Sequence, residues 1–173
     1  MLKYVLIGAA AISLAGCATV DVANYASERP ALDLAEYFNG TVDGWGMFQD
    51  RSGKVVRRFT VRIDAKWEGN RGTLDEQFEF ADGEKQKRVW TLVKDGDRYS
   101  GTAGDVVGTG HGIQQGNAFN MRYVLQVPWS GWAIDVDMDD WMWRIDDKTV
   151  LNRTVMSKFG FRAGEVTLSF RRR

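Results

Sequence analysis

The sequence of 173 residues has one cysteine, one histidine and two prolines. A single cysteine excludes an internal disulfide and any zinc site built on several cysteines, and a single histidine excludes motifs that need a histidine pair. Neither sign of charge is in excess, because 23 Lys and Arg balance 23 Asp and Glu. We therefore expect no nucleic-acid partner, no metal site and no cofactor.

Aromatic residues and glycine are abundant instead, with nine Phe, seven Trp, five Tyr and 19 Gly. This composition suits many short strands joined by glycine turns, and it argues against disorder. The length is that of a single domain.

The N-terminus has the three parts of a secretory signal peptide. A short basic start over residues 1–3 precedes an apolar run over residues 4–14, and Leu14-Ala15-Gly16-Cys17 ends it. The run is too short for a membrane-spanning helix, which needs about 20 residues. The last four residues resemble the lipobox of bacterial lipoproteins, which implies cleavage before Cys17 and acylation of this cysteine. The alternative is a free structural cysteine after an ordinary signal peptide.

Acylation of Cys17 would make the membrane a partner of this chain. Several acyl chains, at about 0.8 kcal/mol per buried CH₂, anchor a protein permanently. Ala18, in place of Asp, resembles lipoproteins of the outer membrane, so we expect a cell-envelope protein that faces the periplasm. The predicted organisation is a signal peptide over residues 1–16, a lipid-anchored tether over residues 17–36 and a β-barrel domain over residues 37–173.

From residue 39 onward, apolar and polar residues alternate as in strands with one buried face. The predicted strands, four clear and five weaker, cover residues 59–67, 74–80, 119–127, 166–170, 40–48, 87–94, 98–105, 133–143 and 149–157. Gly, Asn and Asp between them suit tight hairpin turns. A meander with such short connections avoids exposed edges by closing. We therefore predict an all-β fold, an antiparallel barrel of about 8–9 strands, preceded by a short helical turn or an extended segment over residues 30–38.

Four groups of residues carry a family resemblance. They are Leu74-Asp75-Glu76-x-Phe78-x-Phe80-x-Asp82-Gly83-Glu84, Arg88-Val89-Trp90, Asp139-Asp140-Trp141-Met142, and Lys158-Phe159-Gly160 with Gly164-Glu165-Val166. They resemble the lipoprotein family catalogued as Domain of Unknown Function 3833, from about Pro30 to the end of the chain. The resemblance implies a bacterial envelope lipoprotein with a lipocalin-like barrel. It implies no chemistry, because no activity is established for that family.

The hairpin around Asp82-Gly83 brings charge onto an apolar face. A three-residue loop over residues 82–84 pairs Glu76 with Trp90 and Phe78 with Arg88, which keeps the apolar residues on one side. Glu76 and Arg88 are then diagonal neighbours within reach of an ion pair. A buried ion pair is costly unless it is satisfied, so this one is either a structural salt bridge or a ligand contact.

Carboxylates recur in the strand predicted over residues 133–143. Asp135, Asp137 and Asp139 share one face about 7 Å apart, a spacing that suits a solvated face better than a calcium site. Asp139 and Asp140 together break the alternation and predict a bulge. Such a bulge would aim Asp140 and Trp141 at the rim of a cavity.

Glycine occupies alternate positions at 108, 110 and 112. No Lys-Ser/Thr pair and no helix follow, so we expect a strand that bends or packs against a bulky neighbour instead of a phosphate-binding loop. His111 has no partner nearby in sequence, although a role as a general base stays open.

Four tryptophans, at positions 129, 132, 141 and 143, cluster close to the aspartates. Their amphipathic rings suit an acyl pocket or the headgroup layer of a membrane, while core packing explains some of them equally well.

We predict a binding module, monomeric by preference, that holds or hands over a hydrophobic ligand such as a fatty acyl chain or related lipid. Arg88 would meet the headgroup, and Glu76 would orient Arg88. The predicted ligand-binding residues are Glu76, Arg88, Trp90, Asp140 and Trp141. No catalytic motif is present. Two alternatives stay open, an envelope enzyme acting on acyl chains with Glu76, His111 or Asp140 as acid or base, and a structural or assembly lipoprotein with a filled barrel.

Overall fold

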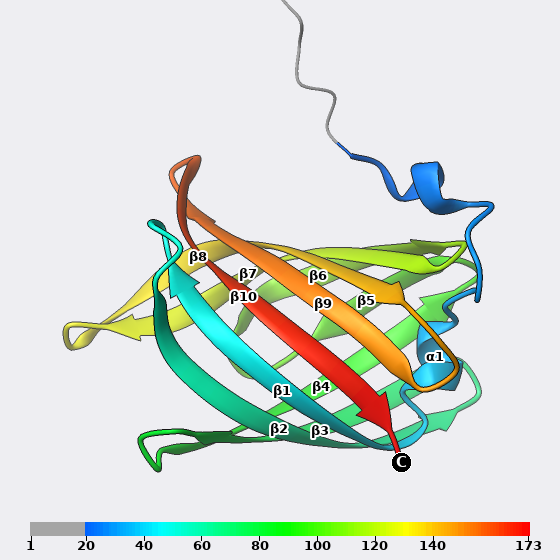
Figure 1. Cartoon of the computed structure of the whole chain (residues 1–173), viewed down its shortest axis with the longest axis horizontal. Coiled ribbons are helices and arrows are strands. Elements are labelled where there is room, and N and C mark those ends of the chain that lie inside the picture. The colour runs from blue at the N-terminus through cyan, green and yellow to red at the C-terminus, as the bar shows by residue number, and fades with distance from the viewer. Residues whose placement is uncertain (1–19) are drawn as a thin grey trace, which may run out of the picture.

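The structure, a computed structural model, describes residues 20–173, which form a closed barrel of ten antiparallel strands (Figure 1). Each strand pairs with its neighbours in sequence, and the first closes on the last. The strands are β1 (Gly40–Asp50), β2 (Val55–Glu68), β3 (Arg71–Phe80), β4 (Lys85–Asp95), β5 (Arg98–Thr102), β6 (Val106–Gln115), β7 (Ala118–Trp129), β8 (Trp132–Arg144), β9 (Thr149–Lys158) and β10 (Phe161–Arg172). The predicted all-β, lipocalin-like meander is confirmed, with a strand count slightly higher than expected.

The tenth strand, β6, is the one that the alternation did not reveal. Gly110 and Gly112 face the barrel interior where an apolar side chain would otherwise mark the strand. A Cβ at Gly112 would lie 2.5 Å from the Phe119 ring, and one at Gly110 would lie 2.8 Å from the end of Met121. The glycines therefore admit bulky neighbours from β7, as the sequence indicated.

Gly108 supplies the expected bend in the same strand. Its φ is +69°, and the pairing of β6 with β7 shifts between Val107 and His111. His111 lies on the exposed outer face, opposite Arg122.

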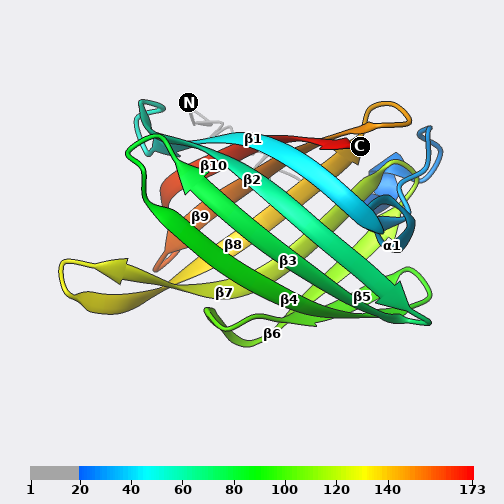
Figure 2. The same ribbon diagram turned by 90° about the horizontal axis from the view of Figure 1, so that it is seen from below.

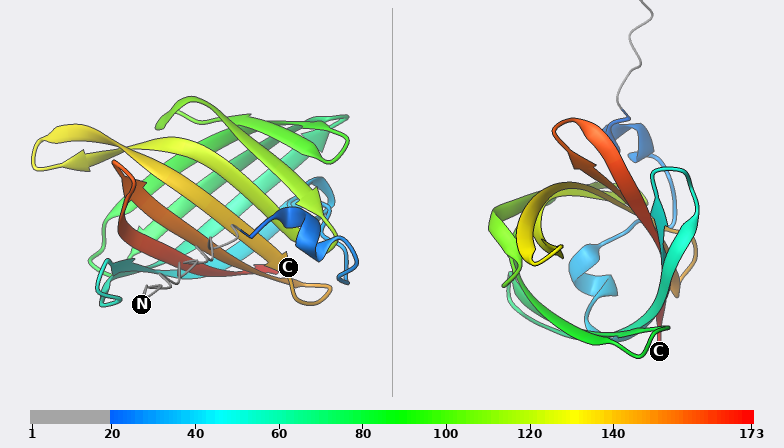
Figure 3. Two further views of the ribbon diagram at one scale, coloured as in Figure 1. Left: turned by 90° about the horizontal axis from the view of Figure 1, so that it is seen from above. Right: turned by 90° about the vertical axis from the view of Figure 1, so that its left-hand side faces the viewer.

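One end of the barrel is closed by the short helix α1 (Leu34–Tyr37), which confirms a helical turn in the lead-in (Figure 2). Leu34, Tyr37 and Phe38 are almost completely buried there. In the right-hand view of Figure 3 the strands form a ring, and α1 lies across its far end. The open end of the barrel is formed by the turns β1–β2, β3–β4, β5–β6, β7–β8 and β9–β10.

Hydrogen bonds from several strands hold α1 in place. The Tyr99 hydroxyl donates to Oε1 of Gln114 at 2.9 Å, and the same oxygen accepts from the backbone N–H of Leu34 at 3.1 Å. Trp67 Nε1 donates to the carbonyl of Phe38 at 2.9 Å. The closed end is thus tied to β2, β5 and β6.

The residues before α1 also pack on the barrel. The 3₁₀ helix η1 (Val22–Tyr25) lies against β6 and β7, where Val22 is buried with Ala118 and Trp141. The described part of the segment predicted as a tether over residues 17–36 is therefore held on the barrel wall. The signal peptide predicted over residues 1–16, and Cys17, lie outside the described residues. Within residues 20–173, no helix has the length and apolarity to cross a membrane.

We predict that Gly112→Ala lowers the free energy of unfolding by about 1–3 kcal/mol, because the new methyl group would overpack against the buried Phe119 ring. Denaturant unfolding of the purified protein measures this. Gly104→Ala is the control, because a Cβ there meets nothing within 4 Å. Equal stability of the two variants would contradict the packing argument.

Candidate functional site

The barrel encloses a cavity of about 720 Å³ that runs from α1 to the open end. Leu34 and Phe38 form its floor, and Phe80 and Trp129 line it near the turns of the open end. This volume lies within the range of about 300–1,000 Å³ that is typical of small-molecule sites. The inward positions of a barrel this wide therefore leave room for a ligand.

Most of the cavity wall is apolar. Alternate residues of β2, β3, β7, β8 and β10 point inward and contribute aliphatic, aromatic and methionine side chains. Representative members are Phe59, Ile63, Leu74, Phe78, Met121, Leu125, Val136, Met138 and Leu168. Such a wall favours the hydrocarbon part of a ligand.

An arginine with two carboxylates interrupts this apolar wall. Arg88 on β4 donates two hydrogen bonds from Nε and one from Nη2 to the Asp105 carboxylate, at 2.8–3.0 Å. Its Nη1 lies 3.7 Å from Glu76 Oε2, an ion pair without a hydrogen bond. The side chains of Arg88 and Glu76 are only 20% and 13% exposed, so water screens this charge weakly.

A second polar group lies around Asp140 on β8. Its carboxylate accepts hydrogen bonds from the Tyr123 hydroxyl, at 3.3 Å, and from Asn152 Nδ2, and the Thr154 side chain also bonds it. Asn152 and Thr154 are buried on β9. Asp140 is thereby a satisfied buried carboxyl rather than an isolated one.

The two groups share one electrostatic environment. Burial raises the pKa of Glu76 to about 7, although the charge of Arg88 acts in the opposite direction. Burial also raises the pKa of Asp140 to about 6, against its hydrogen bonds from Asn152, Thr154 and Tyr123. Two carboxyls that titrate near neutral pH can each donate or accept a proton toward a bound molecule.

Arg88 and Tyr123 keep their protons. Although burial acts to lower the pKa of Arg88, the charge of Glu76 and the hydrogen bonds to Asp105 raise it overall. Burial, with the nearby Asp140 carboxylate, raises the pKa of Tyr123 well above its ordinary value. The polar part of the wall therefore presents a fixed cation and a neutral phenol beside two titratable carboxyls.

Four of the five predicted ligand-binding residues line this cavity, namely Glu76, Arg88, Trp90 and Asp140. The predicted pairing was wrong in detail. Glu76 lies directly opposite Arg88, and Phe78 lies opposite Gln86, because the three-residue turn covers residues 81–83, with Phe80 facing Glu84, instead of residues 82–84. A shift of two residues in the β3–β4 pairing leaves every side chain on its expected face, so Glu76 and Arg88 still form the predicted ion pair.

The fifth residue, Trp141, does not reach the cavity. Strand β8 pairs with β7 without a register shift, so the predicted bulge at Asp139 and Asp140 is absent and strict alternation sends Asp140 inward and Trp141 outward. Trp141 stacks on Trp143 with ring centroids 5.6 Å apart, beneath Tyr25 of η1. These two tryptophans pack the N-terminal segment onto the barrel.

The cavity wall also contains four polar residues that were not predicted as ligand-binding residues, namely Asp105, Tyr123, Asn152 and Thr154. Tyr123, Asn152 and Thr154 occupy inward positions of β7 and β9, and the signal that identifies them is a spacing of two residues from apolar inward residues such as Met121 and Met156. Asp105 lies between β5 and β6, and no local pattern links it to Arg88, 17 positions away. Within residues 20–173, no group of three His, Cys, Asp or Glu side chains is placed to hold a metal ion.

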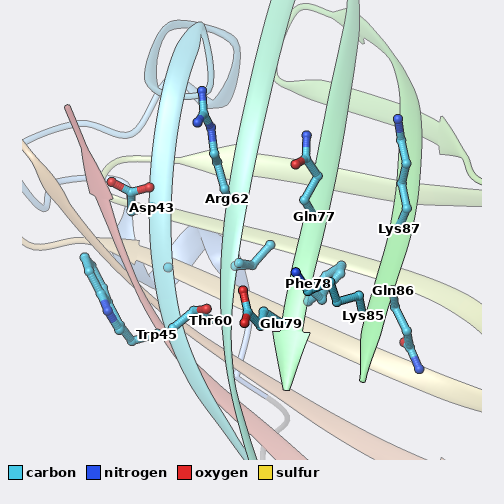
Figure 4. A pocket seen from close by; sticks show the side chains of 12 residues that line it. Asp43, Trp45, Thr60, Arg62, Gln77, Phe78, Glu79, Lys85, Gln86 and Lys87 are labelled. Carbon is cyan, nitrogen blue, oxygen red and sulfur yellow. The ribbon is translucent and has the colours of Figure 1, made fainter. Parts of the chain in front are cut away.

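A second hollow lies over β1–β4 and differs in character (Figure 4). Charged and polar side chains such as Asp43, Arg62, Gln77 and Lys87 line it together with Trp45. These residues alternate with the inward-facing ones on the same strands, so they form the solvated outer face. We therefore place the functional site inside the barrel.

The sequence matches the family described as "Protein of unknown function (DUF3833)" over residues 11–172. The chain belongs to the DUF3833 family. This confirms the resemblance carried by the four groups of residues. No curated protein matches the sequence.

The fold of this DUF3833 protein is similar to a solved structure, an S-type phycobiliprotein lyase, CPES, from Guillardia theta. The TM-score is 0.57 at 11% sequence identity, over 80% of this chain and 90% of that chain. At this identity the likeness shows a shared barrel fold.

We predict that Glu76→Gln stabilises the protein increasingly as the pH rises. A carboxyl whose pKa is about 7 in the folded state and 4.5 in the unfolded state stabilises the fold fully below pH 4.5 and loses that contribution as the pH rises through 7. Glutamine resembles the protonated acid and removes this loss, which is about 3 kcal/mol at most. Thermal unfolding from pH 4 to 8 measures the difference in Tm between variant and wild type.

The control is Glu79→Gln, an exposed position on the same strand. Its difference in Tm from the wild type is expected to stay flat with pH. A flat difference for Glu76→Gln as well would show that Glu76 is ionised in the folded protein and would contradict the burial argument.

Proposed function

We propose that this barrel binds one hydrophobic ligand of the fatty acyl or related lipid type, for holding or transfer. The observation that carries the proposal is a cavity of about 720 Å³, closed at one end by α1 and lined mainly by apolar side chains, with two polar groups around Arg88 and Asp140. A barrel filled by its own side chains, the structural alternative, would have no such space.

The polar group around Arg88 favours a ligand head that brings hydrogen-bond donors or shares a proton. Asp105 already holds Nε and Nη2 of Arg88, so Arg88 is not a free cation. Its Nη1, at 3.7 Å from Glu76, still has hydrogens to offer a ligand oxygen. A fatty acid would therefore meet Nη1 of Arg88 together with Glu76 in its protonated form, and a hydroxyl or ester head would fit the same place.

We further propose that the barrel works in the cell envelope, anchored by acylated Cys17. The support is the resemblance of Leu14-Ala15-Gly16-Cys17 to a lipobox. We predict that Cys17→Ser abolishes incorporation of an alkyne-labelled fatty acid in bacteria that produce the protein. Continued labelling of this variant would remove the anchor from the proposal.

We predict that lipid extraction of the protein purified from envelope, followed by mass spectrometry, recovers an acyl lipid in near-stoichiometric amount. Leu125→Trp with Val136→Trp would fill the cavity, because these facing residues on β7 and β8 both line it, and should lower recovery at least about tenfold.

The matched control is Val124→Trp with Asp137→Trp, the adjacent facing pair on the outer side of the same strands. Recovery from this control should equal that from the wild type. Recovery no greater than from an unrelated lipoprotein, or equal recovery from both double variants, would refute ligand binding inside the barrel.

An enzyme acting on acyl chains is the second candidate, favoured by the two buried carboxyls. Glu76 and Asp140, with pKa values of about 7 and 6 in one cavity, are suited to general acid and base catalysis. The same mass spectra separate the candidates. An enzyme would return altered acyl products that disappear in Glu76→Gln and Asp140→Asn, whereas a carrier would return the same lipid from all three proteins.

A further inference from the structure

Four aromatic side chains project from the open end of the barrel. Trp129 and Trp132 are 66% and 79% exposed, and Phe159 and Phe161 are 84% and 79% exposed. No other large apolar side chain in residues 20–173 is as exposed. They belong to the β7–β8 and β9–β10 turns, which lie at the same end in Figure 1. We call these four residues the aromatic tips.

The turns that carry the aromatic tips are two-residue turns of the kind that asparagine and glycine prefer. Trp129 pairs with Trp132 around Ser130-Gly131, and Lys158 pairs with Phe161 around Phe159-Gly160. Ser130 and Phe159 have positive φ values of 48° and 52°. A bulky residue such as phenylalanine is rare in this conformation and costs free energy there. Because the Phe159 ring is almost fully exposed, packing within the barrel does not offset that conformational cost.

Charged residues of both signs lie around the aromatic tips. Arg51 and Lys54 in the exposed β1–β2 turn follow Asp50, and Lys158 and Arg162 flank the β9–β10 turn. Arg162 is paired with Glu165, and Asp82 and Glu84 of the β3–β4 turn are both paired with Arg57. The aromatic side chains, and not a net charge, therefore distinguish this end of the barrel.

Exposed aromatic side chains at the mouth of an apolar cavity match the interfacial layer of a lipid bilayer. Tryptophan and phenylalanine partition into that layer. We propose that the open end docks on a lipid bilayer surface with the aromatic tips in the interfacial layer. Trp129 also lines the cavity, so a docked barrel would open its interior directly to the lipid.

Docking of the open end on a bilayer is not a consequence of the proposed anchor at Cys17. Helix η1 packs on β6 and β7 near the α1 end, away from the aromatic tips (Figure 1). Three residue steps separate Cys17 from residue 20 and span at most about 11 Å. The open end therefore needs its own affinity for lipid. The proposal goes beyond ligand binding, since it concerns where a ligand would enter.

The test uses the full chain held in unbrominated phosphatidylcholine vesicles, to which a second vesicle population with brominated phosphatidylglycerol and phosphatidylcholine is added. Docking brings Trp129 and Trp132 against bromine, which quenches their fluorescence. We expect quenching that increases with the concentration of the second vesicles until it saturates. Phe159→Ser with Phe161→Ser keeps every tryptophan and should weaken the apparent affinity for the second vesicles at least about tenfold.

The matched control is Val89→Ser with Leu151→Ser, which removes two exposed apolar side chains from the barrel wall. It should be quenched like the wild type. Absence of quenching in the wild type, or equal quenching of both double variants, would overturn the proposal. The proposal would also be overturned if the wild type showed no quenching but formed a dimer in light scattering, and if the Phe159→Ser, Phe161→Ser variant lost that dimer. The aromatic tips would then bind a second copy of the chain. Failure to recover lipid from a protein that still docks would refute ligand binding alone.

Discussion

The closure of β1 on β10 is the constraint on which the rest of the structure depends. Nine residue pairs, from Val42 with Arg172 to Asp50 with Gly164, join the two ends of the meander and leave no free edge. With ten strands in the ring, the circumference exceeds what inward side chains fill, so closure itself creates the cavity. At the seam, Gly44 and Gly46 leave space for Phe170 and Phe59, which would clash with any Cβ there.

A closed ring still has two ends, and α1 makes them unequal. The helix has only four residues and depends on contacts from the wall, including the Tyr37 hydroxyl, which donates to the carbonyl of Lys148 at 2.8 Å. Asp33 caps the helix and is paired with Lys94 at 2.5 Å. Because this end is held by both packing and hydrogen bonds, entry to the interior is directed to the opposite end, where the aromatic tips lie.

Period-two alternation determined what the sequence could and could not predict. It assigns side chains to faces, so Glu76, Arg88, Trp90 and Asp140 were correctly grouped even though the β3–β4 pairing was displaced by two residues. The alternation did not assign the face correctly where the residue type gave no sign of it. Glycines hid β6, and the predicted bulge aimed both Asp140 and Trp141 at the cavity, although unbroken alternation sends the tryptophan outward. The contact between Arg88 and Asp105 depends on the path of the whole barrel, which no local pattern encodes.

The position of charge inside the barrel links fold to function. Burying Glu76, Arg88 and Asp140 among apolar side chains costs folding free energy that an all-apolar wall would not. Glu76 and Asp140 reduce the cost by taking up protons near neutral pH, which leaves Arg88 neutralised by Asp105. A bound polar head that supplies hydrogen bonds would reduce it further. The interior is therefore more favourable for an amphipathic ligand than for a purely apolar one, because only the former satisfies both kinds of wall.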